Sequence, residues 1–174
     1  MVTGGAGFIG SNFCHFLTKK TSEPIVVLDN LTYAGDLRYL PKEVQFEWCD
    51  ISNEDHVLFL FEKHRPKKIW HFAAESHVDN SIANYRPFLE ANVTGTINLL
   101  NASLNVDVEK FHHISTDEVY GSLEYEDTEL FTEETPYDPR NPYSASKAAS
   151  DHYVKTWHNT YGIPYLITNC SNNY

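Results

Sequence analysis

The sequence predicts an α/β fold, a doubly wound parallel sheet in three layers with helices on both faces. Short apolar runs alternate along the chain with longer amphipathic segments, which is the pattern of parallel strands joined by helices. A glycine-rich turn, Thr3–Gly10, follows the first apolar run and opens the first amphipathic segment. The second apolar run ends at an acid, Asp29. Together these features predict a Rossmann-type fold, in which ligands bind at the carboxyl ends of the strands.

Six strands and four helices are expected in alternation. The expected strands are Met1–Thr3, Ile25–Asp29, Gln45–Cys49, Lys68–Phe72, His112–Ser115 and Tyr165–Asn169. The expected helices are Gly7–Lys19, Glu54–His64, Tyr85–Leu104 and Pro142–Tyr161. The last helix has clear limits, because Asn141 can cap it, Pro142 suits its first turn, and Gly162 ends it. Two connections are long, 30–44 and 119–141, and the acidic second one is expected to be a mobile surface segment.

Composition excludes several classes of partner. The 174 residues carry a formal net charge of -11, and no run of Lys or Arg is longer than two. Nucleic acids and anionic membranes need a basic face, so neither is an expected partner. No apolar stretch approaches the roughly 18 residues that cross a bilayer. A nucleotide ligand stays possible, because backbone N–H groups bind phosphate without side-chain charge.

The cysteines and the chain ends also carry expectations. Cys14, Cys49 and Cys170 are few, odd in number and far apart, so we expect small buried residues in a reducing cytoplasm and no metal site. Met1 and Val2 run straight into the glycine loop, and the chain stops just after its last strand. Residues 1–174 are therefore expected to be one domain, truncated at both ends, with a substrate-binding domain beyond residue 174.

The glycine-rich turn has the spacing of a dinucleotide-binding loop. Gly4, Gly7 and Gly10 follow the pattern G-x-x-G-x-x-G, with Phe8 and Ile9 between the last two. Glycines permit the tight turn and let the backbone approach a pyrophosphate, while the helix N-terminus offers unpaired N–H groups. These five residues are therefore candidates for phosphate contacts. A tight turn that binds nothing is the alternative.

Asp29 indicates which dinucleotide binds. It lies 19 residues beyond Gly10 at the end of an apolar run, where a carboxylate accepts hydrogen bonds from the adenosine ribose. A carboxylate repels a 2′-phosphate, and no Arg follows in Asn30-Leu31-Thr32. The sequence therefore favours NAD over NADP. The alternative is an Asp that only caps the next turn.

Tyr143 and Lys147 are a candidate acid/base pair. They are four residues apart on one expected helix, so their side chains share a face. A phenol has a pKa near 10, and a lysine ammonium nearby favours the phenolate and can also hold a cofactor ribose. A surface pair without function is the alternative.

An acidic pair follows the fifth expected strand. Thr116, Asp117 and Glu118 come directly after His112–Ser115, so they should face the crevice. Two adjacent acids suggest an acid and a base with different pKa values. Solvated loop carboxylates or helix-cap residues are the alternative.

These motifs resemble those of the extended short-chain dehydrogenase/reductase family across the whole chain. Within that family, the chain is most similar to the sugar-nucleotide 4,6-dehydratases. The most discriminating feature is the run Thr116-Asp117-Glu118, because related epimerases, decarboxylases and GDP-mannose dehydratases usually lack the Asp. The other stretches that carry the resemblance are Leu28–Gly35, Ala73–Asp79 and Cys170–Tyr174.

The resemblance implies a dehydration of dTDP-glucose to dTDP-4-keto-6-deoxyglucose with tightly held NAD. The sugar is oxidised at C4, loses water across C5 and C6, and is reduced at C6. Tyr143, assisted by Lys147, would take the C4 hydroxyl proton, and Thr116 would hydrogen-bond that oxygen. Glu118 would remove the C5 proton, and Asp117 would protonate the departing C6 hydroxyl.

The resemblance also implies binding contacts and a homodimer. The implied contacts to NAD, besides the glycine loop, are Asp29, Asn30, Thr32, Asp50, Ile51, Ala73, Ala74, Ser76, Tyr143 and Lys147. The implied contacts to the sugar nucleotide are Ser76, His77, Thr116 and Asn172, although His77 could equally be an interior histidine. The expected dimer pairs the helices Tyr85–Leu104 and Pro142–Tyr161 with their symmetry mates.

Two other interpretations stay open. One is a UDP-sugar 4-epimerase or decarboxylase of the same family. The other is an NAD-binding module with no turnover of its own, because family members carry a C-terminal lobe that supplies most contacts to the nucleotide.

Overall fold

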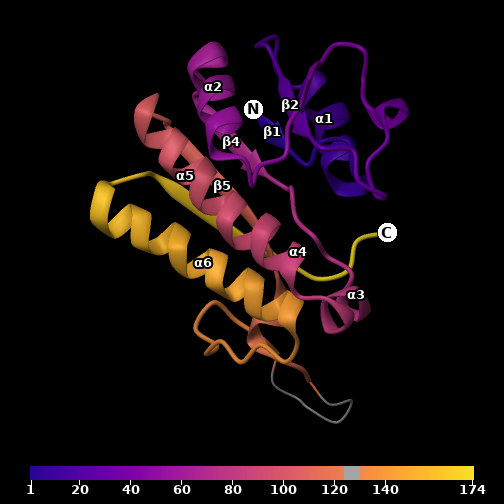
Figure 1. The fold of residues 1–174 in the computed structure, drawn as a ribbon, viewed down its shortest axis with the longest axis vertical. Coiled ribbons are helices and arrows are strands. Elements are labelled where there is room, and N and C mark those ends of the chain that lie inside the picture. The colour runs from indigo at the N-terminus through magenta and orange to yellow at the C-terminus, as the bar shows by residue number, and fades with distance from the viewer. Residues whose placement is uncertain (124–129) are drawn as a thin grey trace.

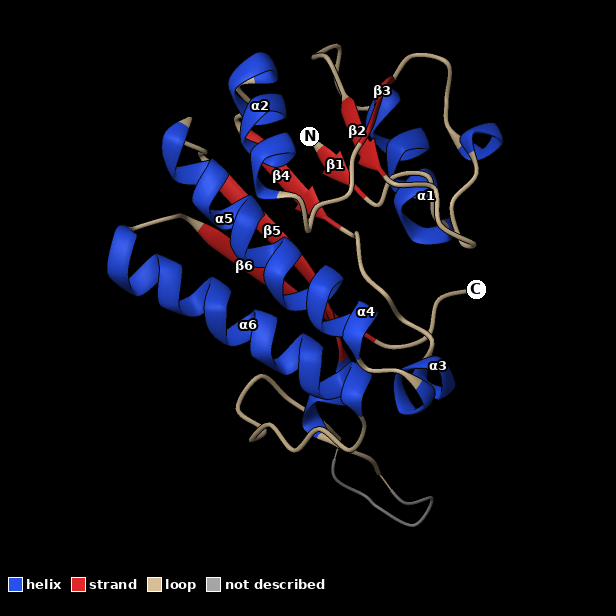
Figure 2. Cartoon of the chain, viewed as in Figure 1, coloured by secondary structure: helices blue, strands red, loops and turns tan. Residues whose placement is uncertain are grey.

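The computed structural model, which describes residues 1–123 and 130–174, has a six-stranded parallel sheet at its centre (Figures 1 and 2). The strand order is β3-β2-β1-β4-β5-β6, so the chain starts in the middle, winds outwards to one edge, and then returns to build the other half. The strands are β1 Val2–Thr3, β2 Val26–Asp29, β3 Gln45–Trp48, β4 Lys68–His71, β5 Lys110–Thr116 and β6 Tyr165–Cys170. The predicted doubly wound fold is confirmed, and its switch point lies between β1 and β4.

The helices cover the sheet on both faces. They are α1 Phe8–Thr18, α2 Glu54–His64, α3 Val78–Ala83, α4 Arg86–Phe88, the π-helix η2 Leu89–Thr94, α5 Gly95–Asn105 and α6 Pro142–Tyr161, with the 3-10 turns η1 Leu37–Tyr39 and η3 Asp117–Tyr120. Figures 1 and 2 show α2, α5 and α6 side by side over one face, and α1 on the other side of the sheet.

The core is divided accordingly into two clusters. One contains Leu28, Phe61 and Phe111 and lies between the sheet and the helices α2, α5 and α6. The other contains Val27 and Cys14 and lies under α1. Adjacent residues of β2 thus enter opposite clusters, as the alternation of side chains along a strand requires. This is the three-layer arrangement that the sequence predicted.

Most expected elements are present, and two departures matter. The predicted bounds of α2 and α6 agree with the structure, and both helices begin at an Asn that accepts a hydrogen bond from a backbone N–H of the first turn. The single helix expected over Tyr85–Leu104 is instead α4, η2 and α5 in succession, and α3 was not predicted. The expected mobility of the segment 119–141 concerns in part residues 124–129, which lie outside the described residues.

The described ranges 1–123 and 130–174 contain no helix with the length and apolar character needed to cross a membrane. In the same ranges, no three His, Cys, Asp or Glu side chains gather as a metal site would require.

Candidate active site

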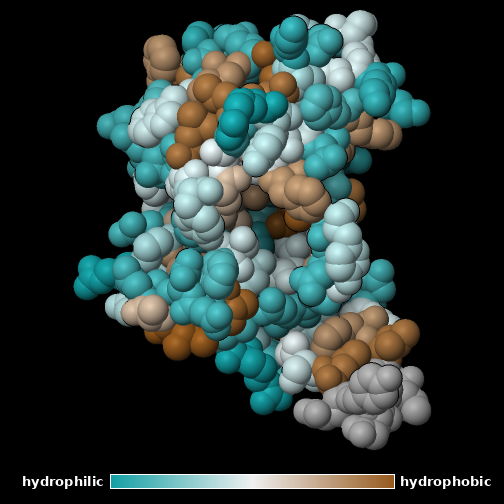
Figure 3. Space-filling model, turned by 90° about the vertical axis from the view of Figure 1, so that its right-hand side faces the viewer, coloured by the Kyte–Doolittle hydropathy of each residue, from teal (hydrophilic) through white to brown (hydrophobic). Residues whose placement is uncertain are grey.

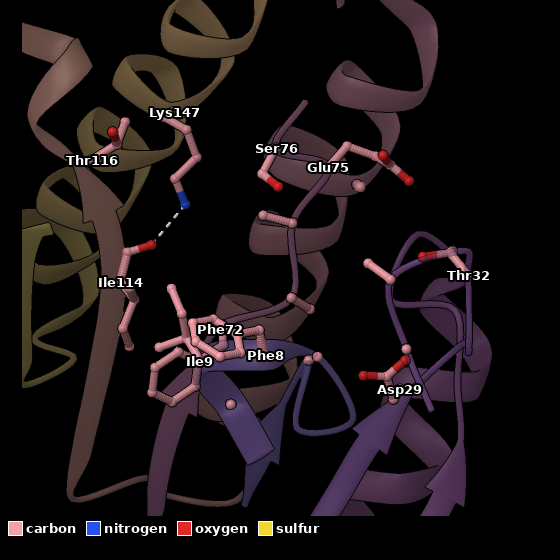
Figure 4. Close-up of a pocket in the computed structure, with 18 of the residues that line it drawn as sticks. Phe8, Ile9, Asp29, Thr32, Phe72, Glu75, Ser76, Ile114, Thr116 and Lys147 are labelled. Carbon is pink, nitrogen blue, oxygen red and sulfur yellow. Dashed lines mark hydrogen bonds between the residues drawn. The ribbon is translucent and has the colours of Figure 1, made fainter. Parts of the chain in front are cut away.

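A cleft of about 460 Å³ lies at the carboxyl ends of the strands. All the residues predicted for the site line it except His77 and Asp117. Figure 4 shows Lys147, Ile114 and Thr116 at one end, Asp29 and Thr32 at the other, and Glu75 and Ser76 on the wall between them. Figure 3 shows one face of the molecule, which is hollowed near its middle. The cleft is therefore elongated, and the two groups of predicted residues occupy its opposite ends.

The glycine loop forms the floor of the cleft and is tightly packed at two of its glycines. Gly4 has a φ of 68°, and a Cβ there would lie 2.6 Å from the Cα of Ala73. A Cβ on Gly10 would lie 2.9 Å from the Cα of Gly5, so neither position accepts a larger residue. At Gly7, by contrast, a Cβ would meet only the carbonyl oxygen of Gly4, at 3.4 Å.

The N-terminus of α1 is open to the cleft. The N-cap residue is Gly7, so no side chain caps the N–H groups of the first turn. Phe8, Ile9 and Gly10 of this turn line the cleft. The N–H groups of a first helical turn have no partner within the helix, and the helix dipole makes this end positive. The loop can therefore hold a phosphate or pyrophosphate with backbone groups alone.

Asp29 joins the glycine loop to the connection that follows β2. One carboxylate oxygen accepts a hydrogen bond from the N–H of Ala6 at 2.9 Å, and the other accepts from the N–H of Leu31 at 2.8 Å. Leu31 has a φ of 54°, in the left-handed region, and this second bond supports it. Asp29 therefore does cap the turn that follows β2, as the alternative interpretation proposed. Asp29 nevertheless lines the cleft together with Asn30 and Thr32, where it can also accept from a ligand hydroxyl.

Asp50 and Ile51 close the same end of the cleft. The carboxylate of Asp50 accepts hydrogen bonds from the N–H of Ser52 at 2.9 Å and from its hydroxyl at 2.8 Å. Ile51 is buried against Gly95, where a Cβ would approach the Ile51 side chain to 2.6 Å. These contacts fix the connection between β3 and α2 at the edge of the cleft.

The segment after β4 forms a wall of the cleft and is held from the π-helix. Asn92 in η2 accepts a hydrogen bond from the N–H of Glu75 at 2.8 Å and donates to its carbonyl oxygen at 2.9 Å. The same amide also donates to the hydroxyl of Ser146 in α6 at 2.8 Å. This arrangement presents Ala73, Ala74 and Ser76 to the cleft.

Glu75 is a lining residue that our sequence reasoning missed, and burial raises the pKa of its carboxyl. Its position after the fourth strand was the available signal.

Tyr143 stands at the start of α6, facing Thr116 at the end of β5. Burial raises the pKa of Tyr143 to about 12, and the charges of Glu118 and Asp117 also raise it, whereas a hydrogen bond with Thr116 lowers it. The net effect favours the neutral phenol in the chain without a ligand, and the expected assistance of Lys147 stays a prediction. Desolvation of the phenol is the dominant cause.

Lys147 lies one helical turn further along α6 and is buried. Its ammonium donates a hydrogen bond to the carbonyl oxygen of Ile114 at 2.8 Å (Figure 4). Burial lowers the pKa of Lys147 to about 8. Along the described part of the chain, it is the only basic residue that lines the cleft.

The acidic pair separates into two environments. Glu118 lines the cleft, and one of its oxygens accepts a hydrogen bond from the amide of Asn141 at 3.0 Å. Asp117 is half-buried outside the lining and accepts from the hydroxyl of Thr116 at 3.3 Å. Asn172 is exposed and lines the cleft. His77 is exposed and lies outside the lining, so the interior-histidine alternative is wrong, and a contact of His77 with substrate stays a prediction.

The sequence matches the family described as GDP-mannose 4,6 dehydratase over residues 1–174. The chain belongs to this family. It is 47% identical to the dTDP-glucose 4,6-dehydratase of Neisseria meningitidis serogroup B, over all of this chain and 53% of that protein. It is 46% identical to dTDP-glucose 4,6-dehydratase 1 of Escherichia coli K12, over all of this chain and 54% of that protein. The chain thus spans about half the length of the curated relatives that it matches.

Solved structures agree with this membership. The dTDP-glucose 4,6-dehydratase of Streptomyces venezuelae, crystallised with NAD, is 43% identical, with a TM-score of 0.92 over 99% of this chain and 55% of that one. The UDP-glucose 4-epimerase of Thermus thermophilus, also in complex with NAD, is 36% identical, with a TM-score of 0.90 over 97% of this chain and 53% of that one. Two reactions therefore occur on closely similar folds.

Proposed function

We propose that this chain is the NAD-binding part of an enzyme that converts dTDP-glucose to dTDP-4-keto-6-deoxyglucose. The observation that carries the proposal is the meeting of two motifs in one cleft. Thr116 ends β5, and Thr116 and Glu118 line the cleft with Tyr143 and Lys147, while Asp117 lies just outside the lining. The glycine loop forms the floor of the same cleft. The identity of 46–47% to named dTDP-glucose 4,6-dehydratases supports this reaction over others of the family.

The described residues fit NAD. The open N-terminus of α1 suits the pyrophosphate, and Asp29 at one end of the cleft suits the adenosine ribose. No arginine of the described residues lines the cleft to accept a 2′-phosphate. Asp50 and Ile51 would border the adenine, and Lys147 at the other end would hold the second ribose.

The chemistry begins with oxidation at C4 of the sugar. NAD, when bound, supplies the hydride acceptor for C4 and later returns the hydride to C6. Tyr143 would accept the C4 hydroxyl proton on its phenolate oxygen, with Thr116 donating to the same sugar oxygen. Because the pKa of Tyr143 is about 12 in the chain alone, this step requires an added positive charge, and oxidised nicotinamide carries one.

The second stage is elimination of water. The C4 ketone acidifies the C5 proton, so the carboxylate of Glu118 can remove it. Asp117, in its protonated form, would donate to the C6 hydroxyl as it leaves. Support for this division of roles comes from the different surroundings of the two acids, with Glu118 held in the cleft by Asn141 and Asp117 beside Thr116.

The test is substrate turnover by a chimaera in which residues 1–174 replace the matching half of the Neisseria meningitidis relative. We expect 4-keto-6-deoxy product from dTDP-glucose and none from UDP-glucose or GDP-mannose. The chain alone, assayed in parallel, should bind NAD without turnover. A chimaera that binds NAD and forms no product from dTDP-glucose would contradict the proposal.

A UDP-sugar 4-epimerase is the second candidate, favoured by the TM-score of 0.90 to the Thermus thermophilus epimerase. An epimerase has no elimination step, so it has no use for Asp117. In the chimaera, Asp117→Asn should stop product formation while C4 oxidation continues, which is seen as bound NADH accumulating. Epimerisation of a UDP-sugar by the chimaera, unchanged in Asp117→Asn, would favour the epimerase.

We further propose a homodimer formed through α6 and the helical run α4, η2 and α5. Leu89 and Tyr85 are half exposed on that run, and an apolar groove between it and α6 includes Val93, Pro142 and Ala149. Leu89→Asp should convert a dimer to a monomer in multi-angle light scattering, whereas Leu130→Asp, at an exposed leucine of another segment, should not. A monomeric wild type would contradict this proposal.

A further inference from the structure

A buried carboxylate on α6 has no part in the reaction proposed above. Asp151 lies four residues after Lys147 and eight after Tyr143, so the three side chains share the face of α6 that packs against β5. The Asp151 side chain is 0% exposed. An ionised carboxylate inside a protein is strongly unfavourable unless it is hydrogen-bonded and paired with a positive charge. Its presence beside the cleft therefore requires a partner.

The partners of Asp151 come from two segments, β5 and the connection that precedes α6. One carboxylate oxygen accepts hydrogen bonds from the hydroxyl of Ser115 at 2.8 Å and from the hydroxyl of Tyr137 at 2.9 Å. The other oxygen lies 3.2 Å from Nε2 of His113, without the alignment of a hydrogen bond. Burial lowers the pKa of His113 to about 4, so this ring is uncharged near neutral pH. Ser115 and Tyr137 thus hold the carboxylate without balancing its charge, while the adjacent His113 lowers the pKa of Asp151.

Lys147 is a buried cation on the same face of α6, one helical turn before Asp151. The two side chains reach adjacent residues of β5, Ile114 for Lys147 and Ser115 for Asp151, although no N–O distance of 4.0 Å or less joins them directly. The side chain of Lys147 is 3% exposed, and its ammonium makes one hydrogen bond, to the carbonyl oxygen of Ile114.

Burial is the larger influence and lowers the pKa of Lys147 to about 8, while the charge of Asp151 acts in the opposite direction and raises it. The pKa of Asp151 is lowered overall, because its contacts with His113 and Lys147 outweigh the opposing effect of burial. The other titratable groups around this pair include His71, His113, Tyr120, Tyr137, Tyr143 and Cys170. A second lysine, Lys155, lies one helical turn after Asp151 and donates a hydrogen bond to the hydroxyl of Tyr137 at 3.4 Å.

We propose that Asp151 is the positioning residue of Lys147. Its carboxylate, fixed by Ser115 and Tyr137, is the buried counter-charge that keeps the lysine protonated and directed at the cleft. Without it, the pKa of Lys147 falls below its present value of about 8, and a neutral amine can neither assist Tyr143 nor bind a ribose as a cation. The part of this role that concerns the cofactor rests on the proposed function, whereas the pairing of the two charges does not.

The direct test is an NMR titration of the Lys147 side chain in the 174-residue chain, with the signal assigned by its loss in Lys147→Met. Removing an opposite charge close by shifts a pKa by about 1 or more. We therefore expect Asp151→Asn to lower the pKa of Lys147 by at least about 1, which takes the protonated fraction at pH 8 from about half to about a tenth. Asp138→Asn is the matched control, because Asp138 is an exposed acid paired with Arg140, and it should leave the titration unchanged.

A reciprocal measurement covers the case in which Asp151→Asn does not fold. Two coupled groups shift each other by the same amount, so Lys147→Met should raise the pKa of the Asp151 carboxyl as much as Asp151→Asn lowers that of Lys147. This variant keeps the carboxylate and its bonds to Ser115 and Tyr137. An unshifted pKa of Lys147 in Asp151→Asn, or an unshifted pKa of Asp151 in Lys147→Met, overturns the proposal.

The titrations separate this inference from the proposed function, because they need neither substrate nor cofactor. In the active chimaera, Asp151→Asn should also move the alkaline limb of the kcat profile to lower pH, and Asp138→Asn should not. If the chimaera has no dehydratase activity, the coupling between the pKa values of Lys147 and Asp151 can still be measured in the 174-residue chain. Lost activity with an unmoved Lys147 titration makes Asp151 a structural residue only and refutes its positioning role.

Discussion

Replacing Gly7, Gly10 or Gly162 with Ala should change stability and NAD affinity in three different ways. The new methyl group at Gly7 would touch only the carbonyl oxygen of Gly4, at an ordinary 3.4 Å, and the backbone there has a φ of -80° that Ala adopts freely. Gly7→Ala should therefore keep or slightly raise stability, since Gly→Ala at a compatible position contributes about 0.4–1 kcal/mol. Because Gly7 lines the cleft, the methyl group should instead obstruct the approach of a pyrophosphate.

The magnitudes distinguish the three variants. Loss of one charged hydrogen bond costs about 1.5–3 kcal/mol, so Gly7→Ala should weaken NAD binding about 10- to 100-fold. At Gly10 the methyl group would overlap the backbone of Gly4 and Gly5, so the variant should lose about 1–3 kcal/mol of stability as well as NAD affinity. Gly162→Ala meets no atom within 4 Å but keeps a φ of 80°, which costs roughly 1 kcal/mol and leaves NAD binding unchanged.

Two measurements on the same samples decide the matter. Urea unfolding gives the stability of each variant, and isothermal titration calorimetry gives its affinity for NAD. Gly162→Ala controls for loss of affinity that results from instability alone. If Gly7→Ala bound NAD as tightly as the wild type, the pyrophosphate could not lie against this loop, and the assignment of the cleft to a dinucleotide would be refuted.

Three further predictions follow from the charges of the site. Asp29→Asn should weaken NAD binding about tenfold and raise the ratio of NADP to NAD affinity, measured by calorimetry, because the repulsion of a 2′-phosphate is removed. The unfolded chain holds the Lys147 proton more tightly than the folded chain, because the pKa of Lys147 is lowered on folding. This residue should therefore make the free energy of unfolding rise with pH between pH 8 and 10. Urea unfolding of Lys147→Met should lack that rise. The pKa of Tyr143, read as the ultraviolet titration difference between wild type and Tyr143→Phe, should fall when NAD binds and stay near 12 with NADH.

Local signals in the sequence were sufficient to predict the bounds of helices whose ends carry capping residues. Asn141 and Pro142 predicted the start of α6, and the structure has a capping box there, in which Asn141 and Ser144 bond each other's backbone N–H groups. Gly162 has the left-handed conformation expected of a residue that ends a helix. These signals lie within a few residues of the boundary that they set. They can therefore be recognised without knowledge of the fold.

The π-helix and α3 could not be predicted in the same way. η2 contains Asn92, whose bonds reach Glu75 and Ser146, 17 and 54 residues away in the chain. A widened helical turn that depends on such contacts leaves no local pattern in the sequence, and π-segments are frequent at functional sites. The helix α3 is six residues long and follows His77, which makes no side-chain cap bond, so neither its length nor its start gave a signal.

Spacing also predicted which residues meet in the cleft more reliably than it predicted their charges. The four-residue interval between Tyr143 and Lys147 placed both side chains on one face of α6, but their pKa values depend on burial and on groups from other elements. Burial raises the pKa of the phenol and lowers that of the ammonium, so burial shifts each group towards its uncharged form. A nearby opposite charge favours the ionised form of each group. For the lysine, the fold itself supplies the carboxylate of Asp151. For the tyrosine, the positive charge would come from the bound ligand. On the proposed function, the chain therefore positions these side chains, and a bound cationic ligand would supply the charge that Tyr143 needs.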